Sequence, residues 1–100
     1  MKHYPRLDGN HKQIVQELRQ FPGVSVHSTA QLGGGFGDIV VGYKKTNYLF
    51  EIKDPTKPPS SRVLTPDEQK FHSNWSGQID TVMSTEDVLK RIGYPIAGAS

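Results

Sequence analysis

A carboxylate and an amine lie two residues apart in an otherwise apolar stretch of the chain. Glu51 and Lys53 alternate with Phe50 and Ile52 in a segment that favours a β-strand. Because residues two apart in a strand project from the same face, Glu51 and Lys53 share one surface. The β-prone segment before it opens at Asp38. If the two segments pair as an antiparallel hairpin, Asp38 comes to lie beside Glu51 and Lys53.

Two carboxylates and an ammonium group in one place can support metal-dependent hydrolysis. Neighbouring carboxylates repel each other unless a cation neutralises them, and hard oxygen ligands suit Mg²⁺ or Mn²⁺. Such an ion lowers the pKa of a bound water and offsets phosphate charge, while a nearby lysine can orient the attacking water. The pattern therefore indicates hydrolysis of phosphodiester bonds.

The same residues also have a purely structural interpretation. Glu and Lys are common, so a Glu-x-Lys arises by chance in many chains of this size. Glu51 and Lys53 would then form an exposed ion pair worth about 0.2 to 1 kcal/mol, and Asp38 would be a turn residue. Charges inside an apolar strand are unusual, however, and this context favours the functional interpretation.

The sequence before this hairpin predicts a helix, a strand and a loop. Asp8 or Asn10 can cap a helix that ends at Pro22, with four apolar residues on one stripe: Ile14, Val15, Leu18 and Phe21. Residues 24–28 alternate at period two and predict a short strand. The glycine-rich segment 33–37 predicts a loop that leads into the next strand, because glycine loses most freedom on ordering.

The sequence after the loop predicts the hairpin, a helix, a strand and a last helix. Residues 38–43 and 48–53 form the hairpin, and the proline-rich residues 54–61 form an exposed loop. Thr65 and Glu68 predict a capping box that starts the second helix. In that helix we expect two aromatic residues to pack on the sheet rather than to stack on bases: Phe71 and Trp75. A strand at 79–83 and a helix from Ser84 to Gly93 complete the order.

Composition limits the protein to a small number of classes. One hundred residues predict a single domain over 1–100, with a flexible arm at 1–7 and a flexible tail at 94–100. With 34% hydrophobic and 22% charged residues, we expect a soluble protein without a membrane span. The net charge of +2 means that any basic surface must be local. No cysteine and no apolar leader are present, which favours a cytoplasmic protein.

The ordered set of motifs resembles a known family. Residues 37–41 (GDIVV) and 49–53 (LFEIK), within a helix, three strands, a helix and a strand, resemble the PD-(D/E)xK nuclease superfamily. More narrowly, Asp8-x-Asn10, the loop 33–38 and the segment 64–69 (LTPDEQ) are similar to stand-alone VRR-NUC-like nucleases of phages and prophages. The resemblance covers nearly the whole chain and is more specific than any one motif, although motif matches need structural context.

This resemblance implies both a fold and a catalytic site. The implied fold is α/β, a restriction-endonuclease-like αβββαβ core with a small mixed sheet flanked by helices. Asp38 and Glu51 would bind Mg²⁺ or Mn²⁺, with the backbone carbonyl of Ile52 as a further ligand. Lys53 would serve the nucleophilic water.

The chain departs from the family pattern in two places. Gly37 stands where the superfamily name has proline, which is a common variation. Many relatives place a glutamate on the first helix near the metal, and the corresponding residue here is Gln13. Glu17 lies one turn later and could share that face. Gln69 matches a position that looks functional in relatives, although it could equally be a solvated helix residue.

Four residues are candidates for contacts with nucleic acid. Gly34 and Gly35 lack side chains, so a nucleic-acid backbone could approach Asp38 closely. Lys57 and Arg62 flank the proline-rich loop and could contact phosphates without selecting a sequence.

Together these observations predict a Mg²⁺-dependent endonuclease acting on DNA, with branched or junction DNA as the favoured substrate. A chain with one site and little surface suggests a homodimer, as in archaeal-type junction resolvases. We expect no membrane partner and no small-molecule cofactor, and a location in the cytoplasm of a bacterial or phage-infected cell. The alternative is a catalytically weak or inactive nuclease fold that only binds nucleic acid. A sequence-specific restriction-type enzyme would have the same sequence pattern as a structure-specific one, because base recognition depends on how side chains enter a groove of the DNA.

Overall fold

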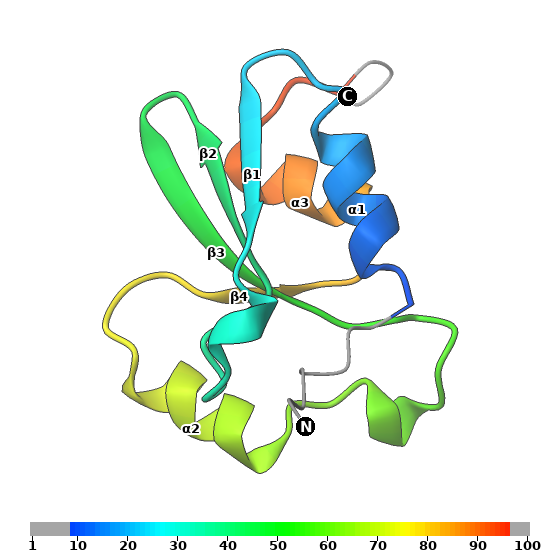
Figure 1. Ribbon diagram of the computed structural model, residues 1–100, viewed down its shortest axis with the longest axis vertical. Helices are drawn as coiled ribbons and strands as arrows, with labels where there is room; N and C mark the ends of the chain where they lie inside the picture. Colours follow the sequence, from blue (N-terminus) through cyan, green and yellow to red (C-terminus); the bar gives the residue numbers. More distant parts are fainter. Residues whose placement is uncertain (1–8, 97–100) are drawn as a thin grey trace.

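Short strands of alternating polarity form a mixed sheet of four strands in the order β1-β2-β3-β4 (Figure 1). The computed structural model describes residues 9–96 of the chain. The strands are β1 (Val24–Ser28), β2 (Ile39–Tyr43), β3 (Thr46–Ile52) and β4 (Asp80–Val82). The first three are antiparallel, and β4 is parallel to β3. With three α-helices, this is the α/β class that the sequence predicts.

The hairpin of β2 and β3 has the register that the functional hypothesis requires. Ile39 lies opposite Phe50, so the start of β2 is beside the end of β3. The turn consists of Lys44 and Lys45, whose φ angles of 50° and 67° are both left-handed. A turn of this mirror-image kind matches the right-handed twist of the strands, which explains how two lysines can close the hairpin.

One face of the sheet carries the hydrophobic core. Helices α1 (His11–Leu18) and α3 (Thr85–Ile92) lie side by side against it (Figure 1), and their buried residues pack with those of the four strands. Phe50 and Ile52 are fully buried in this core. Because neighbouring side chains in a strand point in opposite directions, Glu51 and Lys53 face away from it.

The second helix, α2 (Pro66–Asn74), is separate from this helical layer (Figure 1). Its predicted capping box is confirmed: Thr65 accepts from the backbone N–H of Glu68, and Glu68 accepts from that of Thr65. Its aromatic residues are not part of the core cluster. Phe71 and Trp75 contact the ring of Phe36 in the glycine loop, at centroid distances of 5.5 and 6.1 Å, and Trp75 also lines a pocket with residues of β2 and β3.

The first helix and the end of the chain differ from the prediction. Asn10 is the N-cap residue, but its side chain donates to the carbonyls of Lys53 and Met83 instead of capping. The helix ends at Leu18 and not at Pro22, because the N–H groups of Gln20 and Phe21 donate three residues back, to Glu17 and Leu18, instead of four. The predicted arm at 1–7 lies outside the described residues.

Residues 94–96 were expected in a flexible tail, yet they are packed. The Tyr94 ring lies 5.4 Å from that of Phe21 and 5.3 Å from that of Tyr43, and Ile96 packs against the core. The apolar side chains beyond Gly93 find partners that a sequence-based argument could not supply. Within residues 9–96, no helix combines the length and apolar character needed to cross a membrane.

The close approach of the glycine loop to α2 is testable. A Cβ atom on Gly35 would lie 2.6 Å from the carbonyl oxygen of Asp67, whereas one on Gly34 would meet nothing within 4 Å. Both residues have positive φ, so either alanine substitution strains the backbone by roughly 1–2 kcal/mol. We therefore expect Gly35→Ala to lower the free energy of unfolding more than Gly34→Ala does, as measured by denaturant unfolding. Equal losses would contradict the loop–helix contact.

Candidate functional site

Asp38 is fixed at the end of the hairpin by three hydrogen bonds. Its backbone N–H donates to the carbonyl of Phe50 at 2.8 Å, and its own carbonyl accepts from Thr29 at 2.8 Å. Its side-chain Oδ2 accepts from the backbone N–H of Ile52 at 2.7 Å. The carboxylate thus continues the β2–β3 hydrogen-bond ladder. This arrangement places Asp38 next to the strand positions that carry Glu51 and Lys53.

Glu51 and Lys53 lie together on the same face of β3, as the sequence predicts. They are only 3% and 6% exposed, which is unusual for charged residues. Lys53 Nζ is 4.0 Å from Glu51 Oε1. An exposed ion pair, the structural interpretation of this motif, is therefore not what the fold contains.

A third carboxylate, that of Glu68, completes the cluster. Its Oε1 lies 2.7 Å from Lys53 Nζ and also accepts from the backbone N–H of Thr65. We call Asp38, Glu51, Lys53 and Glu68 the acidic site. Sequence reasoning assigned Glu68 only to helix capping. The capping box itself was the available signal, because it fixes the direction of the Glu68 side chain.

The carboxyl groups of the acidic site differ strongly in proton affinity. Burial, which is the largest cause, and the hydrogen bonds and charges of the adjoining Glu68 and Asp38 carboxyls together raise the pKa of Glu51 to about 10. Burial also acts to raise the pKa of Glu68, but hydrogen bonds to Glu51, Lys53 and Thr65 outweigh it and lower that pKa to about 2. At neutral pH Glu51 is therefore protonated and Glu68 is ionised.

A small pocket of about 120 Å³ gives access to the acidic site. The glycine loop forms one wall of it and the two strands and α2 form the other. Its lining residues are Ala30, Gly33, Gly35, Phe36, Gly37, Asp38, Glu51 and Glu68. A group that enters this pocket meets three carboxyl groups, a loop rich in glycine and the aromatic residue Phe36.

The donor set of this pocket fits a divalent cation. Three carboxyl groups face a single ammonium group, so the cluster lacks positive charge and holds a proton on Glu51 instead. A cation between Asp38 and Glu51 would supply that charge, and the remaining ligands would be backbone carbonyl and water, as Mg²⁺ prefers. Across residues 9–96, no three His, Cys, Asp or Glu side chains form a preassembled metal site. A cation held here would take two carboxylates, those of Asp38 and Glu51, from the side chains of the protein.

The structure does not bring the predicted first-helix residues into this pocket. Gln13 donates to Glu17 at 3.2 Å, and Glu17 also accepts from the Thr85 hydroxyl of α3. Both residues line a separate pocket of about 180 Å³ together with Asp54. The Thr85 hydrogen bond lowers the pKa of Glu17, with a smaller contribution from Gln13.

The other predicted site residues have mixed positions. Gly35 lines the acidic-site pocket, whereas Gly34 lines a neighbouring one beside α2. Gln69 donates to the carbonyl of Leu64 at 3.3 Å and is exposed. Lys57 and Arg62 lie in the loop after β3, where their backbone N–H groups donate to Asp54 and Pro59. Ile52 contributes its N–H to Asp38, and its side chain is fully buried.

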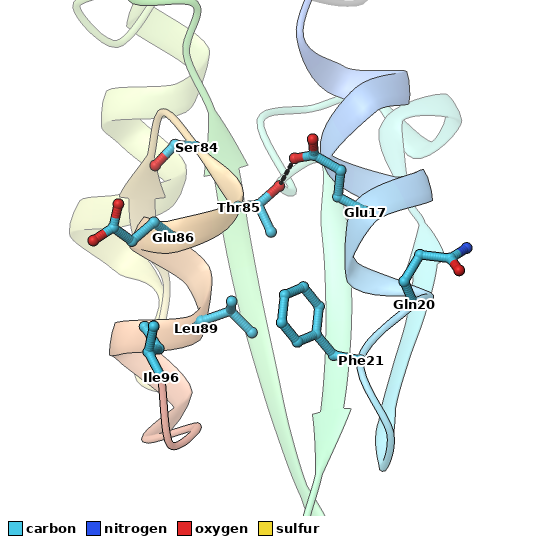
Figure 2. A pocket seen from close by; sticks show the side chains of 8 residues that line it. All are labelled: Glu17, Gln20, Phe21, Ser84, Thr85, Glu86, Leu89 and Ile96. Carbon is cyan, nitrogen blue, oxygen red and sulfur yellow. Dashed lines mark hydrogen bonds between the residues drawn. The ribbon is translucent and has the colours of Figure 1, made fainter. Parts of the chain in front are cut away.

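The largest pocket lies elsewhere, between α1 and α3 (Figure 2). Its volume is about 630 Å³, and Figure 2 shows Phe21 and Leu89 at its apolar base with the Glu17–Thr85 hydrogen bond at its rim. Two carboxylates line it, Glu17 and Glu86, but both are exposed, whereas Glu51 of the acidic site is buried.

Comparison of the chain with protein-family models, with curated proteins and with solved structures finds no match. Conclusions about function therefore rest on the residues and their geometry.

The raised pKa of Glu51 predicts a pH-dependent stability. A carboxyl whose folded pKa lies above its unfolded value of 4.5 stabilises fully below pH 4.5, and this contribution is lost as the pH rises towards 10. The lowered pKa of Glu68 acts in the opposite sense, but only below pH 4.5. In chelator, the free energy of unfolding should fall from about pH 5 to about pH 9, by up to about 1.4 kcal/mol per pH unit.

Denaturant unfolding across this range checks the expectation. Glu51→Gln should flatten the profile, because glutamine cannot lose the proton. Glu86→Gln, which removes an exposed carboxylate paired with Lys90, should leave the slope unchanged. A profile of the wild-type protein without a decline would show that Glu51 is ionised in the fold.

Proposed function

We propose that the protein is a metal-dependent endonuclease that hydrolyses DNA phosphodiester bonds. The observation that carries this proposal is the burial of Glu51 and Lys53 beside the half-buried Asp38 at one point of the sheet, with a pocket leading to the two carboxyls. Burying charged groups lowers the stability of a fold, and such clusters are common at functional sites. With a bound metal ion, these groups could hydrolyse a phosphate diester.

The order of elements supports the same proposal. One helix, three antiparallel strands, a helix and a strand parallel to β3 correspond to the αβββαβ order of the restriction-endonuclease-like core. We propose on this basis, together with the sequence motifs, that the chain is a VRR-NUC-like member of the PD-(D/E)xK superfamily. Fold similarity alone does not determine function, so the acidic site remains the stronger argument.

Each residue of the acidic site has a proposed role. Asp38 and Glu51 would hold Mg²⁺ or Mn²⁺, with the Ile52 carbonyl as a backbone ligand. When bound, the ion lowers the pKa of a water and offsets the charge of the phosphate. Lys53 would orient the attacking water and stabilise the charge that develops on the phosphate. Glu68 would hold Lys53 in place, since its Oε1 lies 2.7 Å from Lys53 Nζ.

Branched DNA is the substrate that we propose, and a homodimer is the proposed assembly. A chain with one acidic site cuts one strand, so two copies are needed to make paired cuts at a junction. Such an enzyme would act in the cytoplasm of a bacterial or phage-infected cell.

The alternative function is binding of nucleic acid without efficient cleavage. Two observations favour it: Gln13 and Glu17 are outside the acidic-site pocket, and Lys53 is engaged by Glu68. A site without a carboxylate from the first helix could hold one ion weakly and cut slowly.

Cleavage of labelled four-way junction, flap, duplex and single-stranded DNA tests the proposal. We expect cutting with Mg²⁺ or Mn²⁺ but not with chelator. Asp38→Asn and Lys53→Ala should each reduce the rate by about 100-fold or more, the usual effect of removing a group that acts on the transition state. Both variants should still bind the substrate in chelator.

Two controls separate this outcome from damage to the fold. Lys90→Ala removes an exposed lysine of α3 and should cut like the wild type. Asp38→Asn can still accept the hydrogen bond from Ile52 through its amide oxygen, so it should fold normally. Binding without cleavage under any metal would favour the alternative function. Symmetric paired nicks in the junction would support the dimeric enzyme.

A further inference from the structure

A second pocket, near the acidic site, is lined by α2 and the glycine loop. Its volume is about 400 Å³, and its lining residues are Gly34, Asp67, Lys70, Phe71, Asn74 and Trp75. Two pairs of consecutive residues are divided between the two pockets. Gly34 and Asp67 line the second pocket, whereas their neighbours Gly35 and Glu68 line the acidic-site pocket. Because consecutive Cα atoms are about 3.8 Å apart, the pockets share a wall that is one residue thick.

The second pocket contains a rigid aromatic surface. Phe71 and Trp75 stack with their ring centroids 5.0 Å apart and an interplanar angle of 21°. The ring of Phe36 meets both edge-on, so three aromatic rings hold each other in place. Trp75 is nevertheless 44% exposed. The Trp75 indole is held by Phe71 and Phe36 and is partly exposed to solvent, so it can stack with a planar ligand.

We infer that this pocket binds an unpaired nucleobase of the DNA strand whose phosphate occupies the acidic site. The inference rests on the proposed function and specifies its substrate: a strand with at least one base out of the double helix beside the cleaved bond. Stacking on aromatic side chains is the usual way in which proteins hold unpaired bases.

The polar lining of the pocket favours a base over a phosphate. Asp67 carries a negative charge that repels phosphate, while its carboxylate can accept hydrogen bonds from the edge of a base. Asn74 can both donate and accept at such an edge. Lys70 is exposed and lies on the same side of α2, where it can contact the phosphate that follows the base.

The glycine loop suits a strand that crosses from one pocket to the other. Gly34 has a φ of +63°, and a Cβ placed on it would meet nothing within 4 Å. The protein therefore leaves open space at this residue, which lines Trp75's pocket and directly precedes Gly35 of the acidic-site pocket. A sugar–phosphate backbone can pass close to the loop there without meeting a side chain.

The single tryptophan of the chain provides a direct test. In chelator, where no cleavage occurs, we measure quenching of Trp75 fluorescence by a thymidine oligonucleotide of about twelve residues, a site size typical of single-strand binders. The comparison ligands are an abasic oligonucleotide of the same length and the matching duplex. We expect strong quenching by the thymidine strand and little by the other two.

Affinities of labelled strands for variants complete the test. Trp75→Ala should weaken binding of the thymidine strand by about 10-fold and leave binding of the abasic strand unchanged. Trp75→Phe, which retains a stacking surface, should restore most of the loss. Lys90→Ala serves as the control, because it removes a cation far from α2 along the chain. Circular dichroism of each variant verifies folding.

The outcomes separate this inference from the proposed function. Quenching by the thymidine strand without cleavage in Mg²⁺ would support the base pocket and remove the enzyme. Cleavage in Mg²⁺ with equal binding of thymidine and abasic strands, unaffected by Trp75→Ala, would overturn the base pocket alone. If none of the three ligands quenches Trp75 fluorescence, the base pocket is also overturned, and the aromatic surface becomes a candidate for contact with a protein.

Discussion

The acidic site depends on an imbalance of buried charge: three carboxyl groups share one ammonium group. Lys53 is satisfied by Glu68 at 2.7 Å, and Glu51 is left beside two other carboxyls with a pKa raised far above its ordinary value. Glu51 therefore holds a proton rather than adding another negative charge to the cluster. We propose that a divalent cation takes the place of this proton, which would suit these residues to metal chemistry.

The rest of the fold holds these groups in position. The hairpin register places Asp38 beside the end of β3, and the Ile52 N–H fixes its carboxylate there. Phe50 and Ile52 are anchored in the core on the opposite face, so the strand cannot rotate Glu51 away. The close contact of Gly35 with Asp67 docks α2, and with it both Glu68 and the aromatic pocket, next to the strand end. Core packing and site geometry are therefore parts of one arrangement.

Much of this arrangement could be predicted from local sequence patterns. Period-two alternation identified β1, and two β-prone segments identified the hairpin. The Thr65–Glu68 capping box and Gly93 located the ends of two helices. Positions that depend on long-range packing could not be predicted. The path of the proline-rich loop, and with it the position of α2, does not follow from local sequence. The contacts of Glu68 with Lys53 and of Trp75 with Phe36 were therefore not predicted. Helical spacing likewise suggested that Glu17 lies near the proposed metal site, whereas its carboxylate accepts a hydrogen bond from Thr85 of α3.

The central claim is that Asp38 and Glu51 together bind a divalent cation, and titration calorimetry with Mn²⁺ tests it most directly. The account predicts binding of one ion per chain to the wild-type protein, and loss of that binding in both Asp38→Asn and Glu51→Gln. Glu86→Gln, an exposed carboxylate of α3, should bind like the wild type. Unchanged binding in the first two variants, or no binding to the folded wild-type protein, would contradict the account.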